Sequence, residues 1–589
     1  MTVKKTLINL IQAFCISFAF FNISGMESGN ILLLIVFGLS AFLLTKEANK
    51  EFTKKVMTVS VFISIIFTLL YMIGGYDRIG GGLENRLYIA VYVVLTALGL
   101  FSLFYHILRS VLTYCMYHSL EEEKQGASKD AKGRTFSFKI WGIYAGIIFL
   151  CMIPVFLMNF PGIMTPDSIV QYLQATHVEA YSNHHPWMHT LFIELFYKIG
   201  FALTGSVNGG IATYTIFQMI LVSAGVGYAI ECLYEMKIKK IWRVTALLLF
   251  VLLPYNLIYG VTMWKDVLFS VGTLCFTVTL ARFLLMNKRG ARDIIIFFVS
   301  GFAFCEFRHN GYYAYLITTL AVLIMCLLSY LKSRKRDLLV YPLIFIALTI
   351  IASLINGPLM KAYDVEQTPS YMSLSIPLQQ MARVVYDEKD LDDADLAMLE
   401  KINDLDYVRN NYCPGGSDNI CQWVAYGDEE YLMTHMSDYV ALWFRIGIRY
   451  PGEYLAAYID QTKGYFYPMN PEQTVFYDIT DNSVGLESNP IIYGPAVVKL
   501  EELMFKLHTM IPVYGVLYSP GSFFWLMILF MGIVICREEK NKLLLFLPVL
   551  GVTLTILAAT PLVADLRYAY ELMITLPYLA LISCKRYTE

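Results

Sequence analysis

Long apolar stretches recur along the whole chain and constrain its fold more than any other feature. Each holds about 17 to 25 mostly apolar residues, long enough to cross a hydrocarbon core about 30 Å thick as a helix. Because 57% of the 589 residues are hydrophobic and 16% are charged, the composition lies outside the usual range for soluble domains. The sequence therefore predicts an all-α polytopic membrane protein. The net charge of −2 and the lack of a basic domain argue against nucleic acid as a partner.

Clusters of basic residues separate these stretches and mark the expected cytoplasmic loops, because lysine and arginine are enriched on that side of a membrane. The clusters are Lys46 to Lys55, Lys124 to Lys139, Lys237 to Lys240, Lys288 to Arg292, Lys332 to Arg336 and Arg537 to Lys542. Between them we expect about 14 transmembrane helices, near 6–24, 30–46, 56–75, 87–112, 139–158, 209–233, 242–260, 266–286, 293–307, 312–331, 338–356, 513–536, 542–561 and 570–584. Because the number of spans is even, both termini are expected in the cytoplasm. We expect the protein to lie in the plasma membrane.

The apolar stretch 187–205 does not fit this alternation. As a further span it would move every later basic cluster to the outside, and it carries His189, Glu194 and Lys198, which are costly against lipid. We prefer an interfacial or re-entrant helix on the outer face. A spanning helix stays open as the alternative.

The predicted topology leaves two large segments outside the cytoplasm. The first is the loop 159–208. The second is a polar region of about 150 residues, expected to form a small, mainly helical extracytoplasmic domain. The expected organisation is an accessory four-helix region 1–136, a membrane core 137–356 that includes the loop 159–208, the outer domain 357–510, and C-terminal membrane helices 511–589.

Two of the eleven cysteines lie in the outer domain. Cys413 and Cys421 bracket the polar segment 414–420, and a disulfide is plausible in an oxidising compartment. Two free thiols are an equally open alternative, because spacing alone does not fix the geometry.

The first outer loop contains two motifs that combine polar residues with a helix start. Thr165-Pro166-Asp167 has the residues of a helix N-terminus, which is a sufficient structural explanation by itself. Asn183-His184-His185-Pro186 opens the stretch 187–205, and these imidazoles can orient a substrate, bind a metal or lie exposed at the interface. The position of both motifs above a membrane span makes them candidates for a site.

Three further groups of charged residues fall on the same predicted face. They are Lys265 and Asp266; Arg308 with Asn310; and Asp565, Arg567 and Tyr568. Each group taken singly is also explained by a surface ion pair or by a side chain that reaches from a helix end to water. Arginine and lysine are suited to bind phosphate oxygens, and a carboxylate beside them can accept a proton. Together these groups indicate a site for a membrane-anchored anion.

This pattern resembles the GT-C superfamily of membrane glycosyltransferases. Protein O-mannosyltransferases and lipid A aminoarabinose transferases carry an acidic residue early in the first outer loop and a His-Pro-Pro element later in it. The segments WKDVLF, EFRHNG, IPLQQMAR and DLRYAYE are similar to an uncharacterised bacterial branch of the superfamily. The resemblance covers roughly residues 139–584.

The resemblance implies inverting sugar transfer from a polyprenyl-phosphate carrier to an extracytoplasmic glycan, lipid or protein acceptor. It makes Asp167 the general base, and it assigns donor or phosphate binding to His184, His185, Lys265, Arg308 and Arg567. Asp266, Asn310, Gln380, Arg383, Asp565 and Tyr568 are expected to line the same cavity. No cofactor is required on this basis, and a divalent cation is compatible with it.

The sequence departs from the superfamily pattern at two points. Trp187 takes the place of the second proline, and Asp167 stands alone where some members carry an Asp-Glu pair. The second departure leaves the base and any metal requirement open. A flippase or transporter of lipid-linked saccharides is the alternative outside catalysis, although transporters place charges at the bilayer midplane within repeated halves. A polysaccharide polymerase or ligase is the alternative within it.

Overall fold

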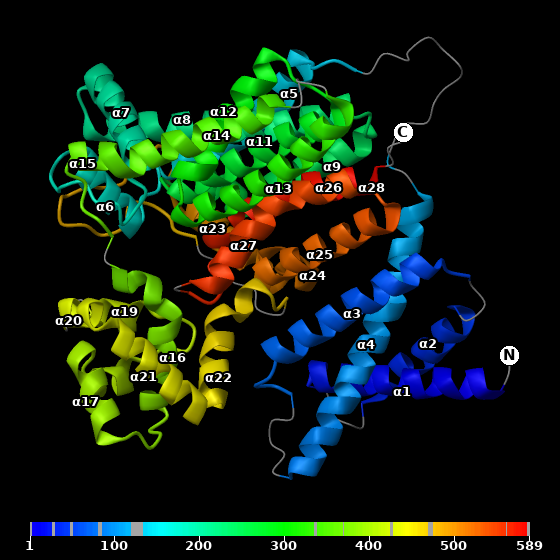
Figure 1. The fold of residues 1–589 in the computed structure, drawn as a ribbon. Coiled ribbons are helices and arrows are strands. Elements are labelled where there is room, and N and C mark those ends of the chain that lie inside the picture. The colour runs from blue at the N-terminus through cyan, green and yellow to red at the C-terminus, as the bar shows by residue number, and fades with distance from the viewer. Residues whose placement is uncertain are drawn as a thin grey trace.

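A computed structural model describes residues 3–25, 30–47, 51–79, 85–118, 120, 134–334, 339–368, 370–424, 428–468, 475–560 and 562–585. Every named element in these ranges is a helix, and the extended backbone forms only isolated bridges there. Figure 1 shows the helices as a large core, a group of N-terminal helices and a smaller unit beside the core. The predicted all-helical membrane protein is confirmed at this level.

Ten helices among the described residues are long and apolar enough to cross a membrane, or eleven if one bent pair is a single span. Each of the predicted segments is helical, but three are too short to count: α2 (Ile31–Glu47), α12 (Ala291–Glu306) and α28 (Tyr570–Cys584). The pair α9 (Lys240–Val251) and α10 (Pro254–Val261) is bent by 62°, because Pro254 cannot donate the hydrogen bond that would continue α9. The predicted number of 14 is therefore not established.

The N-terminal group comprises α1 (Val3–Ser24), α2, α3 (Lys54–Gly74) and α4 (Arg86–Tyr117). A buried Glu47 on α2 accepts hydrogen bonds from Arg109 and Ser110 of α4, so polar contacts tie these two helices together. The group joins the core through aromatic packing, since Phe67 of α3 stacks on Trp525 of α25 (Pro520–Arg537) with ring centroids 4.1 Å apart. These contacts identify α1–α4 as a region attached to one side of the core (Figure 1).

The core contains most of the remaining helices, long and short, and α11 is the most buried of its long helices. They are α5 (Phe138–Met158), α8 (Val207–Glu235), α9, α10, α11 (Lys265–Met286), α12, α13 (His309–Ser333), α14 (Val340–Leu354), α25, α26 (Lys540–Leu543), α27 (Leu547–Ala558) and α28. The apolar part of α11 is 89% buried, so this helix contacts other helices on nearly every side. Small residues allow the close approach, as at Gly272, where an added Cβ would lie 2.7 Å from Ala303 of α12.

One end of the core carries the first outer loop. It contains α6 (Pro166–Ala175) and α7 (Trp187–Thr204), which packs along α8. α7 is not among the helices that are long and apolar enough to cross a membrane, and its interfacial position stays a prediction. His189 fastens α7, because its buried ring contacts Gln171 of α6 at 3.1 Å and the Tyr214 hydroxyl of α8 at 2.7 Å.

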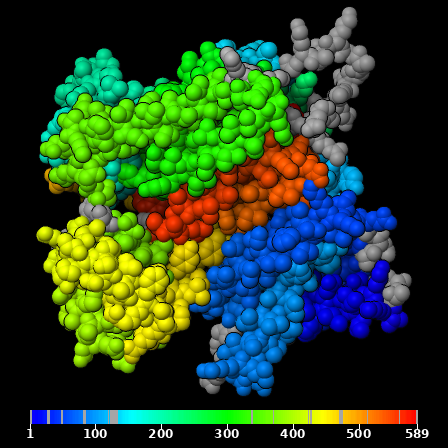
Figure 2. Space-filling model, in the orientation of Figure 1, coloured from blue at the N-terminus to red at the C-terminus, as the bar shows by residue number. Residues whose placement is uncertain are grey.

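The segment after α14 forms a separate helical unit. A π turn, η2 (Ile355–Leu359), leads through α15 (Met360–Ala362) and η3 (Ser370–Leu374) into the unit. Its helices are α16 (Ser375–Tyr386), α17 (Asp393–Ile402), α18 (Leu405–Asn411), α19 (Asp418–Val424), α20 (Glu429–Thr434), α21 (Met436–Arg449) and α22 (Pro451–Thr462). The unit has a hydrophobic core of its own, made of buried residues from the stretch Tyr371 to Tyr454. Figure 2 shows the unit as a distinct body beside the membrane core.

The chain then returns to the core before its last helices. A short turn, η4 (Lys463–Tyr465), follows α22, and α23 (Pro495–Met510), α24 (Pro512–Gly515) and η5 (Val516–Tyr518) precede α25. The turn η6 (Leu544–Phe546) lies before α27, and η7 (Leu566–Ala569) lies before α28. The first residues of α1 and the last of α28 point to one end of the molecule, whereas α6 and α7 lie at the other (Figure 1).

Candidate functional site

An extended segment before α6 determines where the site forms. The Ile163 amide donates to Val261 at 3.0 Å and its carbonyl accepts from Met263 at 2.9 Å. On its other side, Met164 exchanges hydrogen bonds with Asp478 at 3.1 Å and Thr480 at 2.9 Å. The start of α6 is therefore held between the end of α10 and the segment that follows the helical unit.

Side-chain hydrogen bonds then join the N-terminus of α6 to that of α11. The Trp264 indole N–H donates to the Thr165 hydroxyl at 2.6 Å, and the Ser168 hydroxyl donates to the Met263 carbonyl at 2.6 Å. Thr165 and Ser168 also form a capping box, as expected for a helix start of this composition. Asp167 and Lys265, which are 98 residues apart in sequence, are thus brought side by side.

Asp167 lies at the centre of a cluster of charges. Its Oδ2 accepts from Lys265 Nζ at 2.9 Å and from Arg567 Nη1 at 3.0 Å. Arg567 is itself held by Asp565, whose Oδ2 lies 2.7 Å from the guanidinium Nε. The Tyr568 hydroxyl accepts from Arg567 Nη2 at 3.1 Å. We call these groups, together with His185, Asp266 and Arg308, the ionic cluster.

The histidines border the lysine of the cluster. Lys265 Nζ donates to His185 Nδ1 at 3.2 Å, which requires an unprotonated nitrogen there. Burial and the neighbouring Lys265 charge hold the pKa of His185 well below its usual value. The His184 ring lies beside it with ring centroids 4.7 Å apart and the planes tilted by 59°, and burial lowers the pKa of His184 as well. Both imidazoles are therefore neutral near pH 7.

Arg308 reaches the cluster from the turn between α12 and α13. Its Nε lies 3.1 Å from Asp266 Oδ1, and its Nη1 donates to the Tyr568 carbonyl at 2.8 Å. The ring of His309 donates to the Asn183 carbonyl at 2.9 Å, which fastens this turn to the residue before the histidine pair. The side-chain oxygen of the neighbouring Asn310 is buried and has no hydrogen-bond partner within the described part of the chain.

Opposing influences set the protonation state of Asp167. Burial raises its pKa, but the charges of Lys265 and Arg567 outweigh burial and hold the pKa well below the usual aspartate range. Three carboxylates in the cluster, Asp167, Asp266 and Asp565, face the three cations Lys265, Arg308 and Arg567. Asp167 already pairs with two of these cations, so an anionic ligand must compete with it for them.

Asp418 is a fourth carboxylate that the sequence did not indicate. The Val563 amide donates to Gly415 at 2.8 Å, so the loop before α19 lies on the segment that leads to Asp565 and Arg567. Burial raises the pKa of Asp418, and the charges of Arg567 and Asp167 act on it. Its only sequence signal is a charge after Gly415-Gly416-Ser417, which is typical of any polar loop.

Gln380 and Arg383 do not join the cluster through any contact in the described residues, contrary to the expectation that they line its cavity. The Gln380 amide bonds Tyr454 and Trp443, and Arg383 pairs with Asp460 at 2.8 Å. Both lie on α16 and fasten it to α21 and α22. Amphipathic packing of the helical unit explains them.

Cys413 and Cys421 are both free thiols. Cys413 is exposed, whereas Cys421 on α19 is buried in the core of the helical unit. The alternative of two free thiols is the one observed. Within the described ranges, no group of three or more His, Cys, Asp or Glu side chains is arranged to hold a metal ion.

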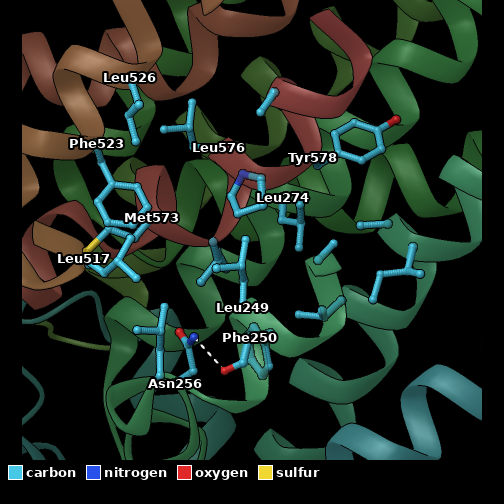
Figure 3. A pocket seen from close by; sticks show the side chains of 18 of the residues that line it. Leu249, Phe250, Asn256, Leu274, Leu517, Phe523, Leu526, Met573, Leu576 and Tyr578 are labelled. Carbon is cyan, nitrogen blue, oxygen red and sulfur yellow. Dashed lines mark hydrogen bonds between the residues drawn. The ribbon is translucent and has the colours of Figure 1, made fainter. Parts of the chain in front are cut away.

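An apolar cavity of about 210 Å³ lies between α8, α9, α10, α25 and α28. Figure 3 shows side chains such as Leu249, Phe523 and Met573 around it, while the Asn256 amide is turned away to the Phe250 carbonyl at 2.9 Å. Tyr255 also lines this cavity.

Aromatic rings connect the apolar cavity with the ionic cluster. Tyr255 packs on Tyr570, Tyr570 on Tyr259 and Tyr259 on Trp264, with centroid distances of 6.4, 5.0 and 5.1 Å. The guanidinium of Arg567 lies 5.3 Å from the Trp264 ring centroid, within the range of a cation–π contact. A continuous aromatic wall therefore leads from an apolar space to a charged one.

The fold and the site together define a polytopic membrane protein with an ionic cluster at one end of its helical core. Residues 165–589 match the model of a family of unknown function, DUF6020, and the chain belongs to that family. The matched region contains every member of the ionic cluster and begins two residues before Asp167. Searches of curated proteins and of solved structures found no match.

Proposed function

We propose that the protein is a membrane glycosyltransferase of the GT-C type. It transfers a sugar from a polyprenyl-phosphate carrier to an extracytoplasmic glycan, lipid or protein, with inversion at the anomeric carbon. The observation that carries the proposal is the convergence of Asp167 with Lys265 and Arg567 at 2.9 and 3.0 Å. These residues come from three distant parts of the chain.

The cations of the cluster suit a phosphate at the surface of a membrane. Lys265 and Arg567 are mostly buried, with side chains 12% and 14% exposed, so their attraction for an anion is screened less than at an open surface. Arg308 and Arg567 offer planar donor groups, and Lys265 offers a point charge. In the proposed reaction they stabilise the lipid phosphate as it leaves with the electron pair of the sugar–oxygen bond.

The hydrocarbon chain of the carrier has a suitable place in the apolar cavity. Tyr255 belongs to that cavity, and the rings of Tyr570, Tyr259 and Trp264 lead from it to Arg567. A lipid phosphate bound at Arg567 would thus keep its apolar chain against apolar side chains. The cavity holds a segment of such a chain, while the remainder stays in lipid.

Asp167 is the proposed general base, and binding of the donor activates it. While Lys265 and Arg567 pair with Asp167, the low pKa makes its carboxylate a weak base. A phosphate that draws these two cations away leaves burial as the dominant effect, and burial raises the pKa. The carboxylate then accepts the proton of the acceptor hydroxyl as its oxygen bonds to the anomeric carbon.

The remaining cluster residues have supporting roles in this proposal. Neutral His184 and His185 shape the donor side of the site, and Asp565 and Asp266 hold Arg567 and Arg308 in place. Asn310 and Tyr568 complete the lining. A divalent cation at the phosphate remains compatible with these carboxylates.

We place the site outside the cytoplasm on the basis of the positive-inside rule. Lys237 to Lys240 lie at the start of α9, and α11 begins with Lys265 after the far end of the α9–α10 pair. Lys288 to Arg292 lie at the start of α12, and α13 begins with His309 after the far end of α12. Both termini are cytoplasmic in this arrangement.

The test is to incubate purified protein with a panel of polyprenyl-phosphate sugars and to measure release of the lipid phosphate. Wild type should release it from one member of the panel in the presence of an acceptor, and Asp167→Asn should not. Turnover by Asp167→Asn at the wild-type rate would remove the base assignment. Movement of intact donor across a vesicle membrane without release would indicate a flippase instead.

A further inference from the structure

A second cavity, of about 370 Å³, is lined in part by Arg308 and its neighbours. It is formed by the start of α7, the turn between α12 and α13, and the π turn η2. Its volume is within the range of sites that hold small molecules. Unlike the apolar cavity, it has polar side chains on several walls: Asn183, Trp187, Glu306, Arg308, His309 and Asn356.

Glu306 is the most unusual group in this cavity. The residue is 5% exposed, and among the described residues no cation lies within ion-pairing distance of it. The Asn356 amide contacts its two carboxyl oxygens at 3.3 and 3.2 Å. A buried carboxyl group with a single neutral amide as partner is costly, and π turns such as the one that carries Asn356 are often found at functional sites.

Trp187 is a second polar group without a partner. The residue is 1% exposed, and its indole N–H is buried without a hydrogen-bond acceptor among the described residues. Buried donors are satisfied in the great majority of cases. Two residues that line the cavity therefore lack partners that a ligand can supply: the acceptor Glu306, which has one neutral amide, and the donor Trp187.

We infer that this cavity binds a pyranose sugar through its hydroxyl groups. A hydroxyl both donates and accepts, so the hydroxyls of one sugar ring can donate a hydrogen bond to the Glu306 carboxylate and accept one from the Trp187 indole N–H. A phosphate fits less well, because the Glu306 carboxyl lies in the same wall. An ammonium headgroup cannot accept from Trp187 and would face Arg308.

The cavity adjoins the ionic cluster through two shared elements. Arg308 lines the cavity and pairs with Asp266 at 3.1 Å. Asn183 also lines it, and His184 and His185, which follow directly, border Lys265. The identification of this sugar as the group carried by the lipid phosphate rests on the proposed function, whereas sugar binding itself does not.

Saturation-transfer NMR on the full-length protein in detergent tests the inference with free ligands. The probes are the methyl pyranosides of glucose, galactose, mannose and N-acetylglucosamine, and phosphoethanolamine serves as the competing headgroup. At least one pyranoside should show saturation transfer from wild type. Glu306→Gln and Trp187→Phe should each weaken its binding about tenfold, the effect of one lost hydrogen bond to a buried polar group.

Lys198→Ala is the matched control, because Lys198 lies on the exposed side of α7 and its loss should leave binding unchanged. Absence of saturation transfer to every pyranoside would overturn the inference. Equal pyranoside binding by wild type, Glu306→Gln and Trp187→Phe would also overturn it. The same holds if phosphoethanolamine binds in a way that depends on Glu306 and no pyranoside does.

The lipid-phosphate release assay separates this subsite from the proposed function. Pyranoside binding without release from any donor would leave the subsite standing and reject the transferase. Release with wild-type efficiency by Glu306→Gln and Trp187→Phe, without pyranoside binding, would do the reverse.

Discussion

Replacement of Lys265 by methionine should weaken binding of a polyprenyl phosphate strongly. Methionine keeps a long unbranched side chain and removes the charge that now lies 2.9 Å from Asp167 and 3.2 Å from His185. The ionic cluster holds three cations and three carboxylates, and Asp418 is a further carboxylate that interacts with Arg567. In Lys265→Met the carboxylates outnumber the cations, so an incoming phosphate loses one donor and meets an excess of negative charge.

The size of the effect follows from the contact that is lost. A hydrogen bond to a charged group contributes about 1.5–3 kcal/mol, and 1.4 kcal/mol corresponds to a tenfold change in affinity. The Kd should therefore rise by roughly 10- to 150-fold. The side chain of Lys265 is 12% exposed, so screening by solvent reduces this effect only partly.

The assay is equilibrium binding of a radiolabelled short-chain polyprenyl monophosphate to the protein in nanodiscs. Lys463→Met is the control, because Lys463 is also partly buried and paired, with Asp460 at 3.0 Å, but it lies outside the ionic cluster. An unchanged Kd for Lys265→Met, or an equal loss in Lys463→Met, would refute the assignment of Lys265 to the phosphate.

Four further predictions address other parts of the account. Arg308→Ala and Arg567→Ala should each raise the Kd for the donor about tenfold or more; wild-type affinity in both would contradict the clamp. The kcat/KM profile of wild type should show no acid limb from Asp167 above the usual aspartate pKa of about 3.9, because Lys265 and Arg567 lower the pKa of this carboxylate and keep it ionised. In Lys265→Met with Arg567→Gln the two main causes of the low pKa are removed and burial, which raises the pKa, prevails, so an acid limb should emerge at higher pH; an unshifted profile would oppose this. In a Cys413→Ser background, Val207→Cys should react with a membrane-impermeant maleimide added outside the cell, and labelling only from inside would make α7 a span. Arg282→Met should destabilise the fold by about 3–5 kcal/mol, since Glu235 and Asp293 pair with the buried Arg282; thermal unfolding should show Arg409→Met, at an exposed pair, changing stability by less than about 1 kcal/mol.

The helical architecture was accessible from sequence because it depends on local patterns. Apolar length predicts each membrane helix, and Thr165-Pro166 predicts the start of α6, which the capping box confirms. The number of spans was less accessible, because it depends on bends such as the one at Pro254 and on how far α12 and α28 extend.

Part of the site could also be predicted from local sequence patterns. The charges that end apolar stretches, such as Lys265 and Arg567, are conspicuous in sequence, and the fold brings them to Asp167. The predicted helix cap at Thr165 is confirmed, and this helix start positions Asp167 beside Lys265 and Arg567.

Tertiary contacts decide the residues that sequence reasoning missed or misplaced. Asp418 comes near Arg567 because the loop at Gly415 binds the backbone of Val563. Gln380 and Arg383 were predicted from sequence to line the cavity, but their polar groups bind Tyr454 and Asp460 within the helical unit. No local pattern distinguishes these two outcomes.

A structure with a polyprenyl monophosphate bound tests the central claim most directly. The account predicts phosphate density within hydrogen-bonding distance of Lys265 Nζ and the Arg567 guanidinium, with Asp167 released from at least one of these cations and the lipid chain beside Tyr255. Phosphate bound elsewhere, with the Asp167 pairs to Lys265 and Arg567 unchanged, would contradict it.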